Sequence, residues 1–262
     1  MNPVETLSEG AVHLQHSFDP SLVIDFGNGY GITQYMMYVI LVFVLTLLVV
    51  LLIGKRLTLV PKGKFTNMVE YGYEFVRKDM GESAIGHGYK KHLPFLATLF
   101  FFILIANFIG LIPGAKAATG TISVTWALAL ISFIYFNYWG VRAHGGWGYI
   151  KSIAPSGLPK PMVPVIWVFE FISLVLRLLT LAVRLYGNMF AGHMVLGIFA
   201  LATSVFIQSA IATGNVLFGL PPIGWMLLLI AMYAMETLVA FLQAYVFTTL
   251  SAVYISLATS EH

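Results

Sequence analysis

The sequence predicts an all-α integral membrane protein with about five membrane crossings, and three observations lead to this class. Of its 262 residues, 59% are hydrophobic and only 10% are charged, whereas a soluble domain carries about 25% charged residues. Several apolar runs have the length of about 20 residues that a helix needs to cross a bilayer. The last two apolar runs are much longer than a single crossing requires.

Composition also excludes several classes of protein. The chain has no cysteine, which excludes disulfides, cysteine-ligated iron–sulfur clusters and thiol catalysis. A net charge of +3 is too small to indicate a nucleic-acid partner. The first charged residues are acidic and no basic segment precedes an early apolar run, so we expect no cleaved signal peptide.

The first three predicted spans are of ordinary length. They lie at about 35–53, 93–112 and 121–140. The first is uncharged and is followed directly by Lys55 and Arg56, as is typical of a spanning helix that ends at the cytoplasmic surface. The segments 54–92 and 141–162 are polar and basic, and we expect them to be loops.

The two remaining spans, about 165–208 and 223–257, are unusually long. At 1.5 Å per residue a helix over the first of them would reach about 66 Å, more than twice the hydrocarbon thickness of about 30 Å. Each long helix must therefore either bend or lie strongly tilted in the membrane, and the sequence does not choose between these alternatives.

The distribution of basic residues predicts the orientation. Residues 1–33 contain no Lys or Arg, whereas 54–92 contains eight and 141–162 contains three. Because basic loops stay in the cytoplasm, we expect residues 1–33 to be extracytoplasmic. Residues 34–262 then form one transmembrane helical domain, and five crossings leave the C-terminus in the cytoplasm.

Each long span carries a stripe of polar residues. Glu170, Arg177 and Arg184 are spaced by seven residues, nearly two helical turns, so they share one helix face. Glu236 and Gln243 repeat this spacing in the last span. A charge in mid-membrane costs about 2.5–3.5 kcal/mol or more, and such residues usually mark an ion pathway. For Glu170 and Arg177 the alternative is that their side chains reach the membrane surface.

The residue types favour proton transfer. An arginine remains protonated when buried, so Arg184 supplies a fixed positive charge that repels cations and attracts a carboxylate. Histidine and glutamate can titrate within the physiological range, so His193 and Glu236 could relay a proton. A static hydrogen bond between these two side chains, fastening the helices, is the alternative.

Two segments carry a resemblance to a known family. RLYGNMFAGH at 184–193 and ETLVAFLQAYVFTTLSAVYISLATSEH at the end of the chain closely resemble the signature regions of subunit a of F-type ATP synthases, bacterial type. Asn107 and Pro113 in ANFIGLIPG match the second helix of that family. The resemblance covers essentially the whole chain.

The resemblance implies a stator whose two long, strongly tilted helices pack against a ring of c subunits. Two offset aqueous half-channels would deliver protons to and from the carboxylates of that c-ring. Further implied partners are the subunit b peripheral stalk, the F1 sector and the lipid bilayer of a bacterial plasma (inner) membrane. The chain itself would have no catalytic site, cofactor or metal, and would act as a subunit of the ATP-synthesising complex.

The family's functional residues can be carried over by position. Arg184 matches the essential arginine that separates the half-channels, and Asn188 and Gln243 match the polar residues beside it. His193 and Glu236 match two outer half-channel positions, with acid and imidazole exchanged relative to many bacterial members, as in mitochondrial forms. Some bacterial members carry an aspartate where this chain has Gly110. Further expected half-channel residues are Thr180, Arg177, Glu170, Asn107 and Tyr254.

The main alternative is a self-contained ion-coupled secondary transporter or channel. Such proteins usually show repeated halves or broken helices at matching positions, and the sequence shows neither. A haem-binding subunit would need histidines at paired depths, but only His193 lies within an apolar span. A membrane hydrolase is disfavoured because neither G-x-S-x-G nor H-E-x-x-H occurs.

Overall fold

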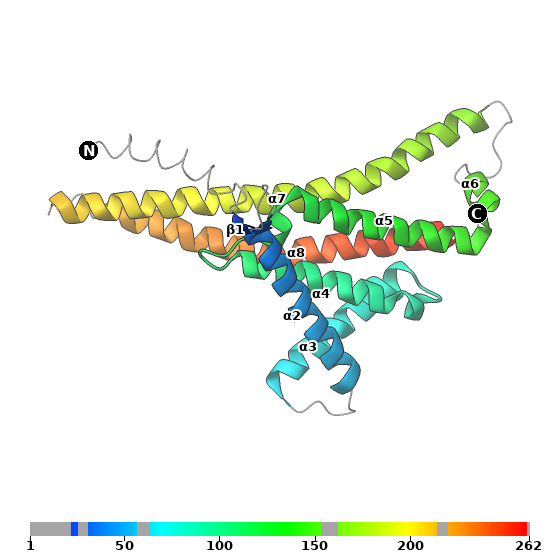
Figure 1. The fold of residues 1–262 in the computed structure, drawn as a ribbon, viewed down its shortest axis with the longest axis horizontal. Coiled ribbons are helices and arrows are strands. Elements are labelled where there is room, and N and C mark those ends of the chain that lie inside the picture. The colour runs from blue at the N-terminus through cyan, green and yellow to red at the C-terminus, as the bar shows by residue number, and fades with distance from the viewer. Residues whose placement is uncertain (1–21, 26–30, 57–62, 153–161, 214–219, 261–262) are drawn as a thin grey trace.

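The computed structural model describes residues 22–25, 31–56, 63–152, 162–213 and 220–260, and these are almost entirely helical (Figure 1). A short antiparallel pair of strands, in which Leu22 lies opposite Thr33, precedes the helices. The elements are β1 (Leu22–Asp25), β2 (Gly31–Thr33), α2 (Gln34–Arg56), α3 (Lys64–Phe75), the π-helical segment η1 (Val76–Glu82), the 3-10 turn η2 (Tyr89–Lys91), α4 (Leu93–Gly110), the 3-10 turn η3 (Ala118–Gly120), α5 (Ile122–His144), α6 (Gly146–Ser152), α7 (Val163–Thr213) and α8 (Leu220–Thr259).

The predicted fold class is confirmed. In the part of the chain that the structure describes, five helices are long and apolar enough to cross a membrane, namely α2, α4, α5, α7 and α8. Their apolar side chains can contact the lipid chains, and every backbone polar group in the helix interior is hydrogen-bonded within the helix. Both are required in lipid, where no water is available to hydrogen-bond the backbone.

The expectation that the two basic segments are loops was wrong for most of their described residues, and 57–62 and 153–161 lie outside the described part of the chain. The segment 54–92 contains α3, η1 and η2, and the segment 141–162 contains the end of α5 and the short helix α6. Within α3 and η1, Val69, Val76 and Met80 are buried at helical spacing. These few apolar positions form one buried stripe, which the basic composition of the segment concealed.

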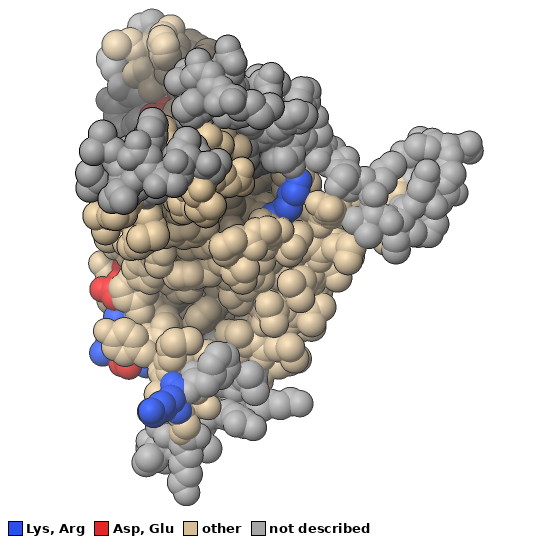
Figure 2. Space-filling model, turned by 90° about the vertical axis from the view of Figure 1, so that its left-hand side faces the viewer, with Lys and Arg blue, Asp and Glu red and all other residues tan. Residues whose placement is uncertain are grey.

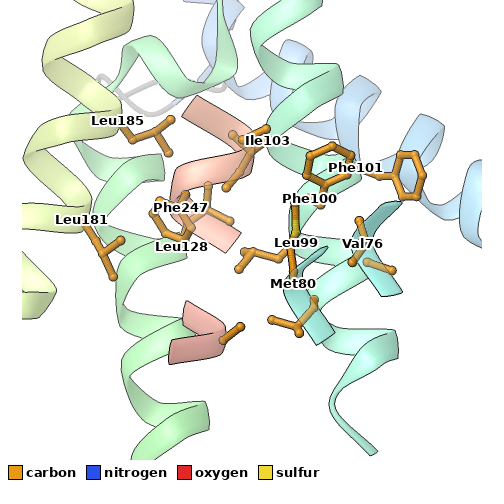
Figure 3. Packing of buried hydrophobic residues seen from close by; sticks show 14 of the residues in the cluster. Val76, Met80, Leu99, Phe100, Phe101, Ile103, Leu128, Leu181, Leu185 and Phe247 are labelled. Carbon is orange, nitrogen blue, oxygen red and sulfur yellow. The ribbon is translucent and has the colours of Figure 1, made fainter. Parts of the chain in front are cut away.

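The hydrophobic core is centred on α4. Ten of its 18 residues are buried, against 11% of an apolar 18-residue stretch in each of α7 and α8. Figure 3 shows Ile103 of α4 between Phe100 and Phe101 on the side of η1 and Leu185 and Phe247 of the long helices on the other side. Thus α7 and α8 pack against the core by one face, and their other faces are exposed.

The two long helices lie side by side and antiparallel (Figure 1). The first, α7, is a single helix of 51 residues, which corresponds to about 77 Å at 1.5 Å per residue. Figure 1 shows that it bends, so that its first part rises away from the axis of the remainder. Of the two alternatives that its length left open, a bend is therefore present.

The surface is largely uncharged, as expected for a protein in lipid. Figure 2 shows one face of the molecule, on which Lys, Arg, Asp and Glu side chains occupy only a few small clusters. Two ion pairs, Lys78 with Glu74 at 2.8 Å and Arg77 with Glu82 at 3.6 Å, lie in α3 and η1. Both are exposed pairs, a kind that contributes little to stability.

Candidate functional site

Two contacts set the register between α7 and α8. The guanidinium of Arg177 lies 5.3 Å from the centroid of the Tyr254 ring. Fifteen residues further along α7, the bare Cα of Gly192 packs against the carboxylate of Glu236, eighteen residues before Tyr254. Arg184 is about midway between the α7 members of these contacts, and its level on α8 is therefore close to Tyr245.

Arg184 is exposed on the described surface of the chain, and two amide side chains lie near its level. Asn188 follows one turn later on α7, and Gln243 is buried in α8 with 7% exposure. Within the described residues, neither Asn188 Nδ2 nor Gln243 Nε2 has a hydrogen-bond partner, although both atoms are buried. Buried donors of this kind are rare in proteins unless water or another molecule satisfies them.

A cavity of about 320 Å³ opens where α4 ends and the chain turns toward η3. His193 of α7 lines this cavity, as does Tyr233 of α8. Lys116 and Tyr35 also line it, with the Lys116 ammonium 5.1 Å from the Tyr35 ring centroid. The remaining lining is apolar or backbone, from Gly110–Ala117, Gly120, Phe190, Leu196, Gly197 and Ala200.

Glu236 is not among the residues that line this cavity. Its side chain is 5% exposed and occupies the space that a side chain at Gly192 would fill. In the part of the chain that the structure describes, neither Glu236 Oε1 nor His193 Nε2 has a hydrogen-bond partner. Glu236 of α8 thus packs against Gly192, the residue next to His193 on α7. Each of the two titratable side chains has a buried atom without a hydrogen-bond partner among the described residues.

Gly110 has a specific role in this geometry. A Cβ added there would lie 3.1 Å from His193 Nε2 and 2.5 Å from the Cβ of Ala117. The absence of a side chain at this position therefore lets the imidazole and the α4–η3 turn approach each other closely. An aspartate, which some bacterial members of the resembling family carry here, would occupy the space that His193 uses in this chain.

Arg177 and its neighbours form a separate group toward the beginning of α7. Tyr254, which stacks under Arg177, also packs against the ring of Phe136 of α5. Thr180 is exposed, and its hydroxyl donates a hydrogen bond to the Arg177 carbonyl at 3.1 Å. Glu170, two turns earlier than Arg177, is half-buried.

Asn107 lies in a different environment from the other expected half-channel residues. It is fully buried at 0% exposure and is absent from the lining of the 320 Å³ cavity. Its amide donates to the carbonyl of Ala240 at 3.1 Å and accepts from the hydroxyl of Thr119 at 2.7 Å.

Several residues of this region were missed by the sequence reasoning. Lys116, Tyr35 and Thr119 lie in or beside short connecting segments, where no periodic pattern singles out a residue. Gly192 sits beside His193 in the signature segment, yet only the packing shows that its missing side chain accommodates Glu236. Among the described residues, no group of three or more His, Cys, Asp or Glu side chains could hold a metal ion.

The fold and the site define a class: a helical membrane protein whose two long antiparallel helices carry an exposed arginine and buried amide and titratable side chains. Residues 35–256 match the family described as ATP synthase A chain. The chain belongs to this family. The resemblance on which the sequence analysis relied is thereby confirmed.

Similar relatives come from several bacteria. The chain is 41% identical to an ATP synthase subunit a of Chloroherpeton thalassium over 77% of this chain and 57% of that protein. It is 37% identical to an ATP synthase subunit a 2 of Prosthecochloris aestuarii over 96% of this chain and 74% of that protein. An ATP synthase subunit a of a Methylobacterium species is 36% identical, and the match covers 94% of its length. The chain thus spans little more than half of the first relative and nearly all of the third.

Proposed function

We propose that this chain is the proton-translocating stator subunit of the Fo motor of an ATP synthase. Two offset half-channels deliver protons to and from the carboxylates of a c-ring, and Arg184 is the charge that separates them. The observation that carries this proposal is an exposed arginine on α7 at the level of two buried, unpartnered amides. An exposed cation on an apolar helix needs a partner from another chain, since a lipid-facing charge is costly.

The energetics suit a transient pair between Arg184 and a ring carboxylate. At about 4 Å and an effective dielectric constant near 20, the attraction between two unit charges is about 4 kcal/mol. This favours the deprotonated carboxylate as it passes the arginine. A membrane potential supplies about 2.3 kcal/mol per charge per 100 mV, which is of comparable size, so the potential can drive the carboxylate onward.

The outer half-channel begins at the 320 Å³ cavity. A proton reaches His193 from this cavity and passes to Glu236, whose carboxylate packs against the neighbouring Gly192. The buried atoms of Asn188 and Gln243 continue the polar route toward the level of Arg184. Coupled titration of an imidazole and a carboxylate lets the two sites share and exchange one proton.

The inner half-channel runs along the other half of α7. Three polar residues precede Arg184 on α7 at intervals of about one to two turns, namely Thr180, Arg177 and Glu170. Tyr254 of α8 lies under Arg177. With the basic segments in the cytoplasm, residues 1–33 lie outside a bacterial inner membrane and the C-terminus inside. Residues 34–262 form one membrane domain whose long helices lie obliquely in the bilayer. Subunit b and the F1 sector complete the complex.

The experiment that tests this function changes Arg184 alone in the complete complex. Arg184→Ala abolishes ATP-driven proton pumping in membrane vesicles while the complex still assembles. Arg184→Lys also fails, because an ammonium is a point charge that can deprotonate when buried. Arg142→Ala is a matched control, since this exposed arginine stacks at 5.4 Å on the Trp139 ring at the end of α5. It leaves pumping intact.

Two results would refute the proposal. One is coupled pumping at a near-normal rate in Arg184→Ala. The other is transport by the chain after purification without a c-ring or a soluble ATPase, which is the behaviour of a self-contained transporter.

A further inference from the structure

A small buried hydrogen-bond network joins three segments around the outer half of the site. Asn107 of α4 donates through Nδ2 to the backbone carbonyl of Ala240 in α8, at 3.1 Å. Thr119 of η3 donates its hydroxyl to Asn107 Oδ1, at 2.7 Å. Asn107, Thr119 and Ala240 are each 0% exposed, so these bonds form in an environment where an unmade bond is costly.

The acceptor in α8 makes the contact specific. In an α-helix the carbonyl of Ala240 already accepts the N–H four residues later, and Asn107 uses its second lone pair. Next to this carbonyl, the buried side chains of Ala240 and Ala244, one turn apart, form a small smooth surface on α8. Such a smooth surface packs closely but specifies the axial position of a helix poorly, whereas a directional hydrogen bond to one carbonyl specifies it well.

The network lies where the proposed outer route would be sensitive to position. Ala240 is one helical turn after Glu236, so its carbonyl and the Glu236 side chain move together. Thr119 belongs to η3, and the adjacent Ala117 and Gly120 line the cavity. Ala117 also touches Gly110 at the end of α4, beside His193. One amide therefore links the helix that carries Glu236 to the cavity wall beside His193.

We propose that Asn107 and Thr119 are positioning residues of the outer half-channel. They fix the height and rotation of α8 so that Glu236 lies against Gly192, within reach of the proton that His193 receives. Asn107 thus acts through α8 rather than by lining the water path. This inference rests on the proposed function and assigns to both residues a role in the geometry of proton transfer.

The test compares variants of Thr119 in the complete complex. Thr119→Val removes the hydroxyl with little change of shape and leaves Asn107 Oδ1 without its donor, whereas Thr119→Ser keeps the donor. A displacement of about 1 Å can slow a positioned reaction up to about 10²-fold. We therefore expect Thr119→Val to lower ATP-driven proton pumping at least about tenfold and to shift the midpoint of its pH profile by about one pH unit. Thr119→Ser retains both the rate and the midpoint.

The pH profile separates positioning from a purely structural role. The variants leave unchanged the titratable groups of this region, which are His193, Glu236, Tyr233, Lys116 and Tyr35. A loss of folded complex would lower the rate at every pH equally, whereas a displaced Glu236 changes the midpoint.

A double variant and a matched control sharpen the test. Asn107→Leu with Thr119→Val removes the buried amide and its donor together, which restores stability because no unsatisfied side chain remains. We expect the pH shift to persist in this double variant, because the hydrogen bond from residue 107 to the Ala240 carbonyl is absent. The control is Ser132→Ala, which removes a buried 2.8 Å hydrogen bond from α5 to Ser251 of α8, far along the helix from Glu236. It leaves the midpoint unchanged.

The proposal is overturned if Thr119→Val pumps with the unchanged pH midpoint, or if the double variant recovers it along with the stability. It is also overturned if Ser132→Ala shifts the midpoint as strongly as Thr119→Val. These results are distinguishable from failure of the proposed function, because Arg184→Ala would remain inactive while only the positioning role was lost. If Arg184→Ala pumped normally, the function itself would fail.

Discussion

Gly192 offers a sharp perturbation, because it is the position against which the Glu236 carboxylate packs. A Cβ added at Gly192 would overlap Oε1 and Cδ of Glu236, and would lie 2.6 Å from Oε2. Alanine is the smallest side chain that creates this overlap. Gly192→Ala therefore displaces the carboxylate while it changes no charged or titratable residue.

The size of the displacement follows from these contacts. Ordinary van der Waals contact with a Cβ begins near 3.4 Å, so even the farthest of the three atoms must move by about 0.8 Å. The carboxylate is the end of a flexible side chain and can move without unfolding the helix. Alanine also has a higher helix propensity than glycine by about 1 kcal/mol, so assembly is retained. A misplacement of this size can cost up to about 10²-fold in rate.

We expect Gly192→Ala to lower ATP-driven proton pumping in vesicles by about tenfold to a hundredfold. The amount of assembled complex, measured by the ATPase activity that purifies with it, stays the same. Gly224→Ala is the matched control on α8, since a Cβ there would meet nothing within 4 Å. Normal pumping by an assembled Gly192→Ala complex would show that the position of the Glu236 carboxylate is irrelevant to transport.

Three further predictions concern the same chain. The exchange His193→Glu with Glu236→His retains much more pumping than either single change, because one acid and one imidazole remain paired; equal loss in all three variants would favour a static contact. Asn188→Cys with Gln243→Cys cross-links α7 to α8 in the otherwise cysteine-free chain, and the absence of a cross-link under oxidation would contradict the register. Burial, and then the charge of the preceding lysine, hold the pKa of His92 below its ordinary value. The unfolded chain then binds more protons than the folded one near and below pH 6.5, so stability falls as pH drops through that range. In the purified complex, the melting temperature should fall less between about pH 7 and pH 5 for His92→Gln than for the unchanged protein. An equal fall in both would exclude this histidine as the source of the pH dependence.

The sequence by itself determined the fold class. Long uncharged runs have one stable solution in lipid, since only a helix satisfies its own backbone there, and this logic is local. It failed at α3 and η1, where the polar composition of 54–92 outweighed the few buried apolar positions such as Val76 and Met80. It gave no sign that His92, in the turn just before α4, is buried at 5% exposure, with Nδ1 3.2 Å from the Tyr135 hydroxyl.

The sequence also singled out the polar residues of the candidate site, because a charge or an amide within an apolar helix is conspicuous in any register. Arg184, Glu236 and Gln243 stand out by residue type and by their seven-residue spacing. Only the tertiary structure decided how the two polar stripes meet. The contacts of Arg177 with Tyr254 and of Gly192 with Glu236 fix the register of the helices, and no pattern within one helix contains that information.

Tertiary packing likewise decided what the inconspicuous residues do. Gly110 and Gly192 are ordinary glycines in the sequence, and their function is the space that they leave for His193 and Glu236. Asn107 was expected in a half-channel, but the structure gives both ends of its amide to partners 12 and 133 residues away. Polarity is a property of one residue and can be read along the chain, whereas empty space and hydrogen-bond partners belong to pairs of segments that only the folded chain brings together.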